Sequence, residues 1–176
     1  ILLCINGAGI QYSWLKQQMG DRDYPEMEQL AQSIPIGSEG LRILPLGNGA
    51  ERMLGNHQTG AQVNNLQFNR HSQAHFFRAG LEGIAFSFVY GLKVFQKMGL
   101  NIDILRVGND NLFQSSVFSQ TIAHLIGSSI EVINTNGAIG AAKASGVATH
   151  ISATPREAMQ QLETVRVFKP EKTHQT

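Results

Sequence analysis

The sequence has 176 residues with 14 basic and 13 acidic side chains, which gives a formal net charge of +1. Apolar residues make up 42% of it and charged residues 15%, a composition that excludes a disordered chain and predicts one globular domain. The balanced charge gives no electrostatic reason to expect a nucleic acid or a membrane surface as a partner. The single cysteine, Cys4, has no second thiol for a disulfide, and no apolar run is long enough for a membrane span. We therefore expect a cytoplasmic domain.

The chain opens with an apolar run, Ile1–Ile5, which is typical of a buried strand. A turn at 6–7 follows, and neither a charged lead-in nor an initiator methionine precedes the run. We therefore expect the chain to begin inside a strand of something longer. An amphipathic helix is predicted next, with Ile10, Trp14 and Leu15 on one side.

The following segment predicts a short helix, a strand and a polar loop. Tyr24 and Pro25 introduce the helix, and the strand covers Leu41–Leu46 before a turn at 47–49. Residues 51–69 are rich in Asn, Gln and Gly, so we expect a loop that contains one short strand.

The longest helix is predicted from an N-cap at Ser72 to Met98, just before a glycine. Its apolar residues recur at helical spacing and form one stripe: Phe77, Leu81, Ile84, Phe88, Leu92 and Phe95. We expect Phe88, at the middle of the stripe, to be buried, and Lys93 and Lys97 to be exposed. Three glycines inside the helix imply the close approach of another backbone: Gly80, Gly83 and Gly91.

The second half alternates strands with helices. Strands are predicted at 102–107, 130–133 and 165–168, and helices at 115–126, 138–148 and from 155 to about 163. Strands that alternate with helices across short turns predict an α/β domain, in which a sheet is flanked by helices.

Two of these strands end in turns that are suited to ligand binding. The turn Gly108–Asn111 precedes a helix that starts at Ser115, and the turn 134–137 leads directly into the helix at Ala138. Ligands bind at the carboxyl ends of strands in α/β sheets, and helix N-termini favour phosphate. Gly, Asn and Asp are also the commonest turn formers, so an ordinary connection between strand and helix explains the first turn equally well.

Three further groups of residues have both a structural and a functional interpretation. Gly137 and Ala138 begin a helix of small residues, which either packs closely against a neighbouring backbone or admits a ligand. Glu51 and Arg52 follow an apolar strand and either form an ion pair that anchors a loop or contact a polar substrate. The six histidines have no metal-ligand spacing, so no metal site is predicted.

The order of four motifs resembles that in the C-terminal half of the FGGY carbohydrate kinases, most closely the xylulokinase branch. The motifs are Leu41–Leu46, Gly49–Arg52, Arg78–Phe86 and Gly137–Ala142, and the Arg-Ala-x-x-Glu-Gly-Ile-Ala-Phe run at 78–86 is the strongest single match. The resemblance covers residues 1–170, with 171–176 as a polar tail. Arg78 and Glu82, one helical turn apart in that run, are expected to brace the helix.

The resemblance implies an α/β domain of the actin/hexokinase-like ATPase class, related to ribonuclease H, with a mixed sheet flanked by helices. It also implies the ATP-binding half of a kinase that transfers the γ-phosphoryl of MgATP to a hydroxyl of a pentulose-like sugar, with xylulose favoured. The N-terminal half of the same kinase would be the partner, and a homodimer is a further expectation. That half would supply the catalytic base, so the resemblance implies no catalytic residue in this segment and no turnover by this chain alone.

The same resemblance implies which residues hold the nucleotide. Adenosine contacts would come from the first turn and its helix, and the start of the small-residue helix would border the nucleotide: Gly108, Asn109, Asp110, Asn111, Ser115, Gly137 and Ala138. The family's turn usually reads Gly-Gly-Gly-Ala-x-Ser, and its glycines fall here on Asp110, Asn111 and Leu112, unless Gly108 shifts the turn by two residues. The alternative is a non-catalytic ATPase-fold module that serves assembly or regulation. An unrelated dinucleotide-binding domain is disfavoured, because no Gly-x-Gly-x-x-Gly follows the first strand.

Overall fold

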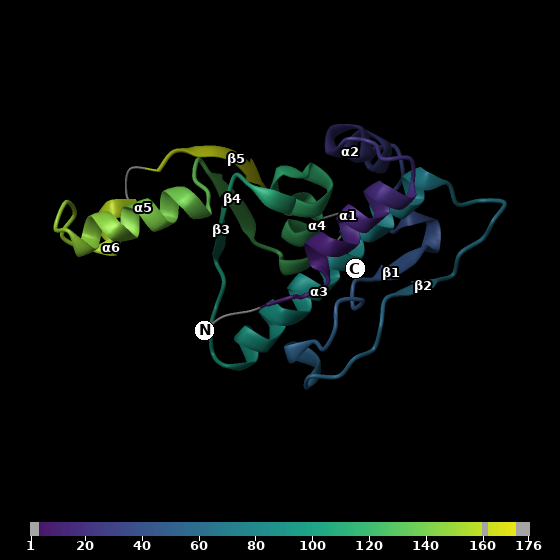
Figure 1. Cartoon of the computed structure of the whole chain (residues 1–176), viewed down its shortest axis with the longest axis horizontal. Helices are drawn as coiled ribbons and strands as arrows, with labels where there is room; N and C mark the ends of the chain where they lie inside the picture. The colour runs from purple at the N-terminus through teal and green to yellow at the C-terminus, as the bar shows by residue number, and fades with distance from the viewer. Residues whose placement is uncertain (1–3, 160–161, 172–176) are drawn as a thin grey trace.

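The computed structural model describes residues 4–159 and 162–171 (Figure 1). Its helices are α1 (Ala8–Gln18), α2 (Tyr24–Gln32), α3 (Gln73–Lys97), α4 (Ser116–Ile126), α5 (Gly137–Ala148) and α6 (Pro155–Met159), with the short 3-10 turns η1 (Ser38–Gly40), η2 (Arg52–Leu54) and η3 (Asn111–Gln114). Its strands are β1 (Arg42–Leu44), β2 (Gln62–Asn64), β3 (Ile104–Gly108), β4 (Ser129–Ile133) and β5 (Thr164–Phe168).

A three-stranded mixed sheet in the order β3-β4-β5 organises the second half of the chain. β3 and β4 are parallel, with Gly108 opposite Ile133 at their carboxyl ends, and β5 is antiparallel to β4. Helices α3 and α4 pack together, and α4 also contacts β4 and β5 (Figure 1). A mixed sheet flanked by helices confirms the predicted α/β architecture.

Only the end of the strand predicted at 1–5 lies within the described residues. Residues 1–3 of that prediction lie outside the described part, and Cys4 and Ile5 belong to no strand. The expected strand at 41–46 is shorter, and it pairs as β1 with β2 in a separate antiparallel ribbon in which Ile43 faces Val63. β2 is the short strand expected within the polar loop.

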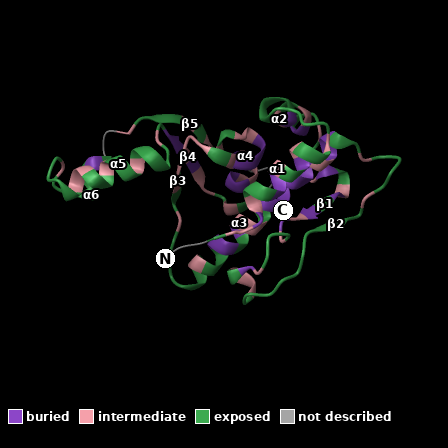
Figure 2. Ribbon diagram, in the orientation of Figure 1, coloured by how far each residue is buried: buried purple, intermediate pink, exposed green. Residues whose placement is uncertain are grey.

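The long helix α3 is the centre of the core, where it packs against α1, α2, α4 and β1. Two of its glycines make this possible. A Cβ on Gly83 would lie 1.8 Å from the carbonyl oxygen of Ile43, and a Cβ on Gly80 would lie 2.6 Å from Leu15. The predicted close approach of another backbone is therefore confirmed at Gly83, whereas Gly80 makes room for a side chain, that of Leu15. The first half of α3 is buried almost all around its circumference (Figure 2).

A buried ion pair braces α3, as expected. Arg78 donates from Nε to Glu82 Oε1 at 2.8 Å, and the two side chains are only 10% and 3% exposed. Glu82 also accepts hydrogen bonds from the backbone amide of Gly37 at 2.9 Å and from the hydroxyl of Ser38 at 3.2 Å. One carboxylate thus joins α3 to the loop that precedes β1.

Burial along α3 differs from the expectation at one position. Phe77 is fully buried, but Phe88 is only partly buried and meets the edge of Phe113 with ring centroids 5.9 Å apart. Leu92, the next residue of the stripe, is buried again, so the partial exposure of Phe88 is local to that position. Lys93 and Lys97 are exposed, as predicted.

The buried face of α1 also differs from the expected one. Ile10 and Trp14 are more than half exposed, whereas Gln11, Tyr12 and Leu15 are buried. The amphipathic pattern therefore placed only Leu15 correctly.

Helices α5 and α6 project from the rest of the molecule and contact each other (Figures 1 and 2). No residue of α5 is buried, so its small side chains face solvent. Within residues 4–159 and 162–171, no helix has the length and apolar character to cross a membrane.

Candidate functional site

The two turns singled out in the sequence meet at one edge of the sheet. Because β3 and β4 are parallel neighbours, their carboxyl ends lie side by side. The backbone amide of Asn109 donates to the carbonyl oxygens of Ile133 and Thr135, each at 3.0 Å. This contact joins the turn at 108–111 to the turn that leads into α5.

Gly108 stands at the point where the two turns touch. A Cβ at this position would lie 2.9 Å from the carbonyl oxygen of Thr135 and 3.2 Å from Asp110 Oδ1. The close approach gives Gly108 a structural role. Since β3 ends at Gly108, this residue occupies the strand-end position, and the chain reaches Ser115 through the extra turn η3.

The three residues that stand where the family's turn has glycines, and whose bulkier side chains would narrow the approach of a nucleotide, differ in their surroundings. Asp110 is half-buried beside Gly108, and Asn111 is exposed and adopts the left-handed conformation at φ +50°. Leu112 packs against the hydrophobic core instead of toward the turn surface. Leu112 therefore does not narrow an approach to the turn, and Asn111 supplies the backbone conformation that glycine would otherwise favour.

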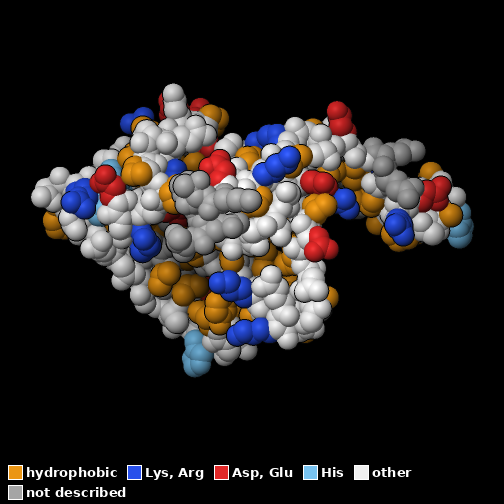
Figure 3. Space-filling view, turned by 180° about the vertical axis from the view of Figure 1, so that it is seen from behind, with side chains coloured by type: hydrophobic (Ala, Val, Ile, Leu, Met, Phe, Trp, Pro, Cys, Tyr) orange, Lys and Arg blue, Asp and Glu red, His pale blue; other side chains and the backbone are white. Residues whose placement is uncertain are grey.

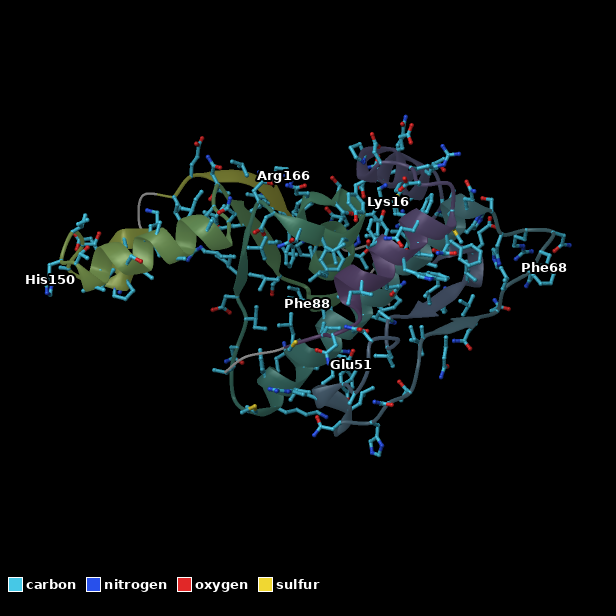
Figure 4. All side chains as sticks on the ribbon, in the orientation of Figure 1. Lys16, Glu51, Phe68, Phe88, His150 and Arg166 are labelled. Atoms are coloured by element: carbon cyan, nitrogen blue, oxygen red, sulfur yellow. The ribbon has the colours of Figure 1, made fainter. Side chains whose placement is uncertain are left out.

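Arg166 on β5 holds the first turn in place, a role that the sequence did not reveal. Its guanidinium donates to Asn109 Oδ1 at 2.9 Å and to the carbonyl oxygen of Gln114 at 3.1 Å. The same group lies over the ring of Phe168, 5.8 Å from its centroid. Figure 4 shows Arg166 beside α4, at the top of the sheet. In the sequence, the only local indication of this role is an arginine between two valines of a short strand.

Ser115 acts as the N-cap of α4. Its hydroxyl oxygen accepts a hydrogen bond from the amide of Phe118 at 3.0 Å and donates to Glu28 Oε2 at 2.6 Å. Both bonds are internal to the protein, so this hydroxyl is already engaged at the start of α4.

The start of α5 is open. Asn136 caps the helix by accepting a hydrogen bond from the amide of Ile139 at 2.9 Å. Gly137 and Ala138 are exposed, and a Cβ on Gly137 would meet no atom within 4 Å. A ligand can therefore approach the backbone here without displacing a side chain.

A cavity of about 800 Å³ adjoins these strand ends. It lies between the sheet and α6 and includes Gly108, Arg106, Glu131 and Arg156 in its lining. Thr135 lines it too, and within the described part of the chain the buried Oγ1 of this residue has no hydrogen-bond partner. Figure 3, seen from behind, shows the lobe of α5 and α6 standing away from the body of the molecule.

Glu51 anchors the N-terminus of α1. Its fully buried carboxylate accepts hydrogen bonds from the amides of Asn6 and Gly7, each at 3.2 Å. Arg52 is exposed, and the salt bridges of residues 4–159 and 162–171 do not join it to Glu51. The expected ion pair is therefore wrong, although Glu51 does anchor a loop. The same residues contain no group of three or more His, Cys, Asp or Glu side chains arranged to hold a metal ion.

No family model matches the chain, but known proteins do. It is 34% identical over 130 residues to a xylulose kinase of Haemophilus influenzae, an alignment that covers 70% of this chain and 26% of the relative. Its fold matches the crystal structure of a xylulose kinase from Rhodospirillum rubrum with a TM-score of 0.76 and 20% identity, over 94% of this chain and 34% of the other.

The Plasmodium falciparum glycerol kinase, solved with ADP, matches with a TM-score of 0.75 and 23% identity, over 93% of this chain and 33% of the other. The chain thus spans between a quarter and about a third of the length of these three proteins. These matches confirm the predicted actin/hexokinase-like ATPase fold and the predicted resemblance. The chain is therefore a relative of the FGGY carbohydrate kinases and corresponds to one part of such a protein.

Proposed function

We propose that the chain is the nucleotide-side, C-terminal part of a sugar kinase, which transfers the γ-phosphoryl group of MgATP to a hydroxyl of a pentulose-like sugar. Xylulose is the favoured sugar, since a relative and a structural neighbour are xylulose kinases. The observation that carries the proposal is the meeting of two turns at the carboxyl ends of β3 and β4, beside the open start of α5. Ligands bind at this position in α/β sheets.

The nucleotide would lie between these two turns. Asn109, Asp110 and Asn111 offer polar groups on one side, and Gly137 and Ala138 offer exposed backbone at a helix N-terminus on the other. Such a helix end favours the negative charge of a phosphate. A protein with a related fold has been solved with ADP, which supports nucleotide binding by a protein of this fold.

We assign different roles to the remaining candidate residues. Ser115 and Gly108 position the turn, because their contacts are made within the protein. Glu51 keeps its structural role, whereas Arg52, the next residue, is exposed. Mg²⁺ would arrive with the nucleotide and neutralise charge on its phosphates as the γ-phosphoryl group moves.

The rest of such a kinase would be the partner of this chain. Phosphoryl transfer depends on groups that position both substrates, and the resemblance places the catalytic base in the other half. Because no residue of α5 is buried, its surface is available for contact with the other half of the kinase. Because the reaction consumes ATP, we propose a cytoplasmic location.

A coupled assay of ADP release tests the proposal directly. The purified chain and the longer protein that contains it would be assayed with xylulose, ribulose, glycerol and gluconate. We expect sugar-dependent turnover by the longer protein, fastest with xylulose, and none by the chain alone. Absence of turnover by the longer protein with every sugar would favour the non-catalytic alternative. Turnover by the chain alone would contradict its assignment as one part of an enzyme.

A further inference from the structure

The N-terminus of α4 already holds a negatively charged group, and that group comes from α2. Glu28 Oε2 accepts a hydrogen bond from Ser115 Oγ at 2.6 Å, and Oε1 accepts one from the backbone amide of Val117 at 3.0 Å. Gln32, one turn along α2, donates to the same Oε1 at 3.0 Å. Three donors from two helices therefore converge on one carboxylate.

These contacts are the ones that a bound phosphate would make. The free amides at a helix N-terminus carry partial positive charge and bind carboxylate or phosphate oxygens. The cap hydroxyl of Ser115 adds a further donor, as hydroxyls do in anion sites. The negative charge of Glu28 also acts on the core, because burial and, next, this charge raise the pKa of the Tyr12 phenol.

We propose that Glu28 is a built-in anion that fills the N-terminus of α4 and excludes phosphate from it. α2 thereby becomes a positioning element, because Glu28 fixes the end of the turn at Ser115 while Arg166 fixes its beginning at Asn109.

The start of α5, unlike the start of α4, has no carboxylate among its contacts within the described residues. Asn136 caps α5 with a neutral amide, and Gly137 leaves its backbone open. The phosphates of a nucleotide would therefore lie toward α5 and not toward α4. This second step rests on the proposed function, whereas the occupation of α4 by Glu28 does not.

Thermal unfolding with inorganic phosphate tests the occupation of α4. The parent chain is compared with Glu28→Ala, which empties the position, and with Glu28→Gln, which keeps it filled by a neutral amide. Glu26→Ala is the matched control, since Glu26 is an exposed acid on the same helix. Each protein is heated in phosphate and in sodium chloride of equal ionic strength.

We expect phosphate at about ten times its dissociation constant to raise the melting temperature of Glu28→Ala by about 3–6 °C. The other three proteins should show only the smaller rise that phosphate, as a kosmotropic salt, gives folded proteins in general. An equal rise in the parent, or no rise in Glu28→Ala, would overturn the proposal. If Glu28→Ala does not fold, the amide resonances of Val117 and Phe118 in the parent chain test whether the N-terminus of α4 is occupied. They should stay unchanged when the labelled parent is titrated with phosphate, and a shift would show that the position is free.

A titration of the same labelled parent with MgADP tests the second step. We expect the amide resonances of Gly137 and Ala138 to move while that of Val117 stays unchanged. Movement of Val117 would overturn the placement of the phosphates. Movement of none of the three would mean that the proposed nucleotide site is wrong, and the phosphate result on Glu28→Ala would still stand.

Discussion

Tyr12 shows how one residue is held in the core at a cost. It is 5% exposed and stacks on Tyr24, and its hydroxyl has no hydrogen-bond partner within the described residues. Burial of the phenol, followed by the negative charge of Glu28, raises the pKa of Tyr12 above its ordinary value of 10.0. The folded protein therefore keeps this phenol neutral at a pH at which the unfolded chain ionises it.

Tyr12→Phe should consequently raise the free energy of unfolding, by up to about 1 kcal/mol, because it removes a buried hydroxyl without a partner. The difference should grow above a pH of about 10, where ionisation stabilises the unfolded parent but not the unfolded variant. Urea unfolding at about pH 8 and about pH 11 measures both effects. Tyr24→Phe is the control, since Tyr24 is 49% exposed. A clear loss of stability in Tyr12→Phe would show that the hydroxyl has a partner.

At the scale of elements, the ion pair of Arg78 and Glu82 connects α3 to the chain before β1. Removal of one member leaves the other buried without its counter-charge. Glu131 offers a comparison, because it pairs with Arg106 at the surface, where the arginine side chain is 69% exposed.

Glu82→Ala should lower the free energy of unfolding by about 3–5 kcal/mol. It leaves the buried charge of Arg78 without a partner carboxylate, and it removes the hydrogen bonds to Gly37 and Ser38 that hold the loop. Glu131→Ala should cost less than about 1 kcal/mol, as is usual for exposed ion pairs. Urea unfolding of both variants gives the comparison. Similar losses in the two would mean that the buried pair does not hold the loop.

Most elements could be predicted because local patterns determine them. The stripe of α3, the Ser115 cap and the turns after β3 and β4 are all features of nearby residues. The burial of α1 could not be predicted, because its polar Gln11 occupies space that Gly80 leaves on a distant helix. Phe88 was misplaced because helical spacing does not show which side chains pack beside each residue of the stripe, and here only the edge of Phe113 meets its ring.

The candidate site was predictable to a similar degree. Parallel strands bring their carboxyl ends together, so the sequence was enough to predict that the two turns, and with them Gly108 and Thr135, are neighbours. The residues that hold the first turn were not. Arg166 is 57 residues from Asn109, and Glu28 is 87 residues from Ser115. Only the tertiary fold brings such pairs into contact.

At the scale of the whole molecule, the chain has a packed core on one side and an open lobe on the other. The core is built around α3, whereas α5 buries no residue (Figure 2). The nucleotide site that we propose lies where the two parts join, at the ends of β3 and β4. The central claim is therefore that the chain binds a nucleotide against the start of α5.

Calorimetric titration of the chain with MgADP tests this claim most directly. Gly137→Trp fills the open space at the start of α5, where an added Cβ meets no atom within 4 Å, and Ala144→Trp places the same side chain at an exposed position further along the helix. We predict that the parent and Ala144→Trp bind with similar affinity, and that Gly137→Trp binds at least about tenfold more weakly, a difference of about 1.4 kcal/mol. Equal binding by all three proteins, or no binding by the parent chain, would contradict the account.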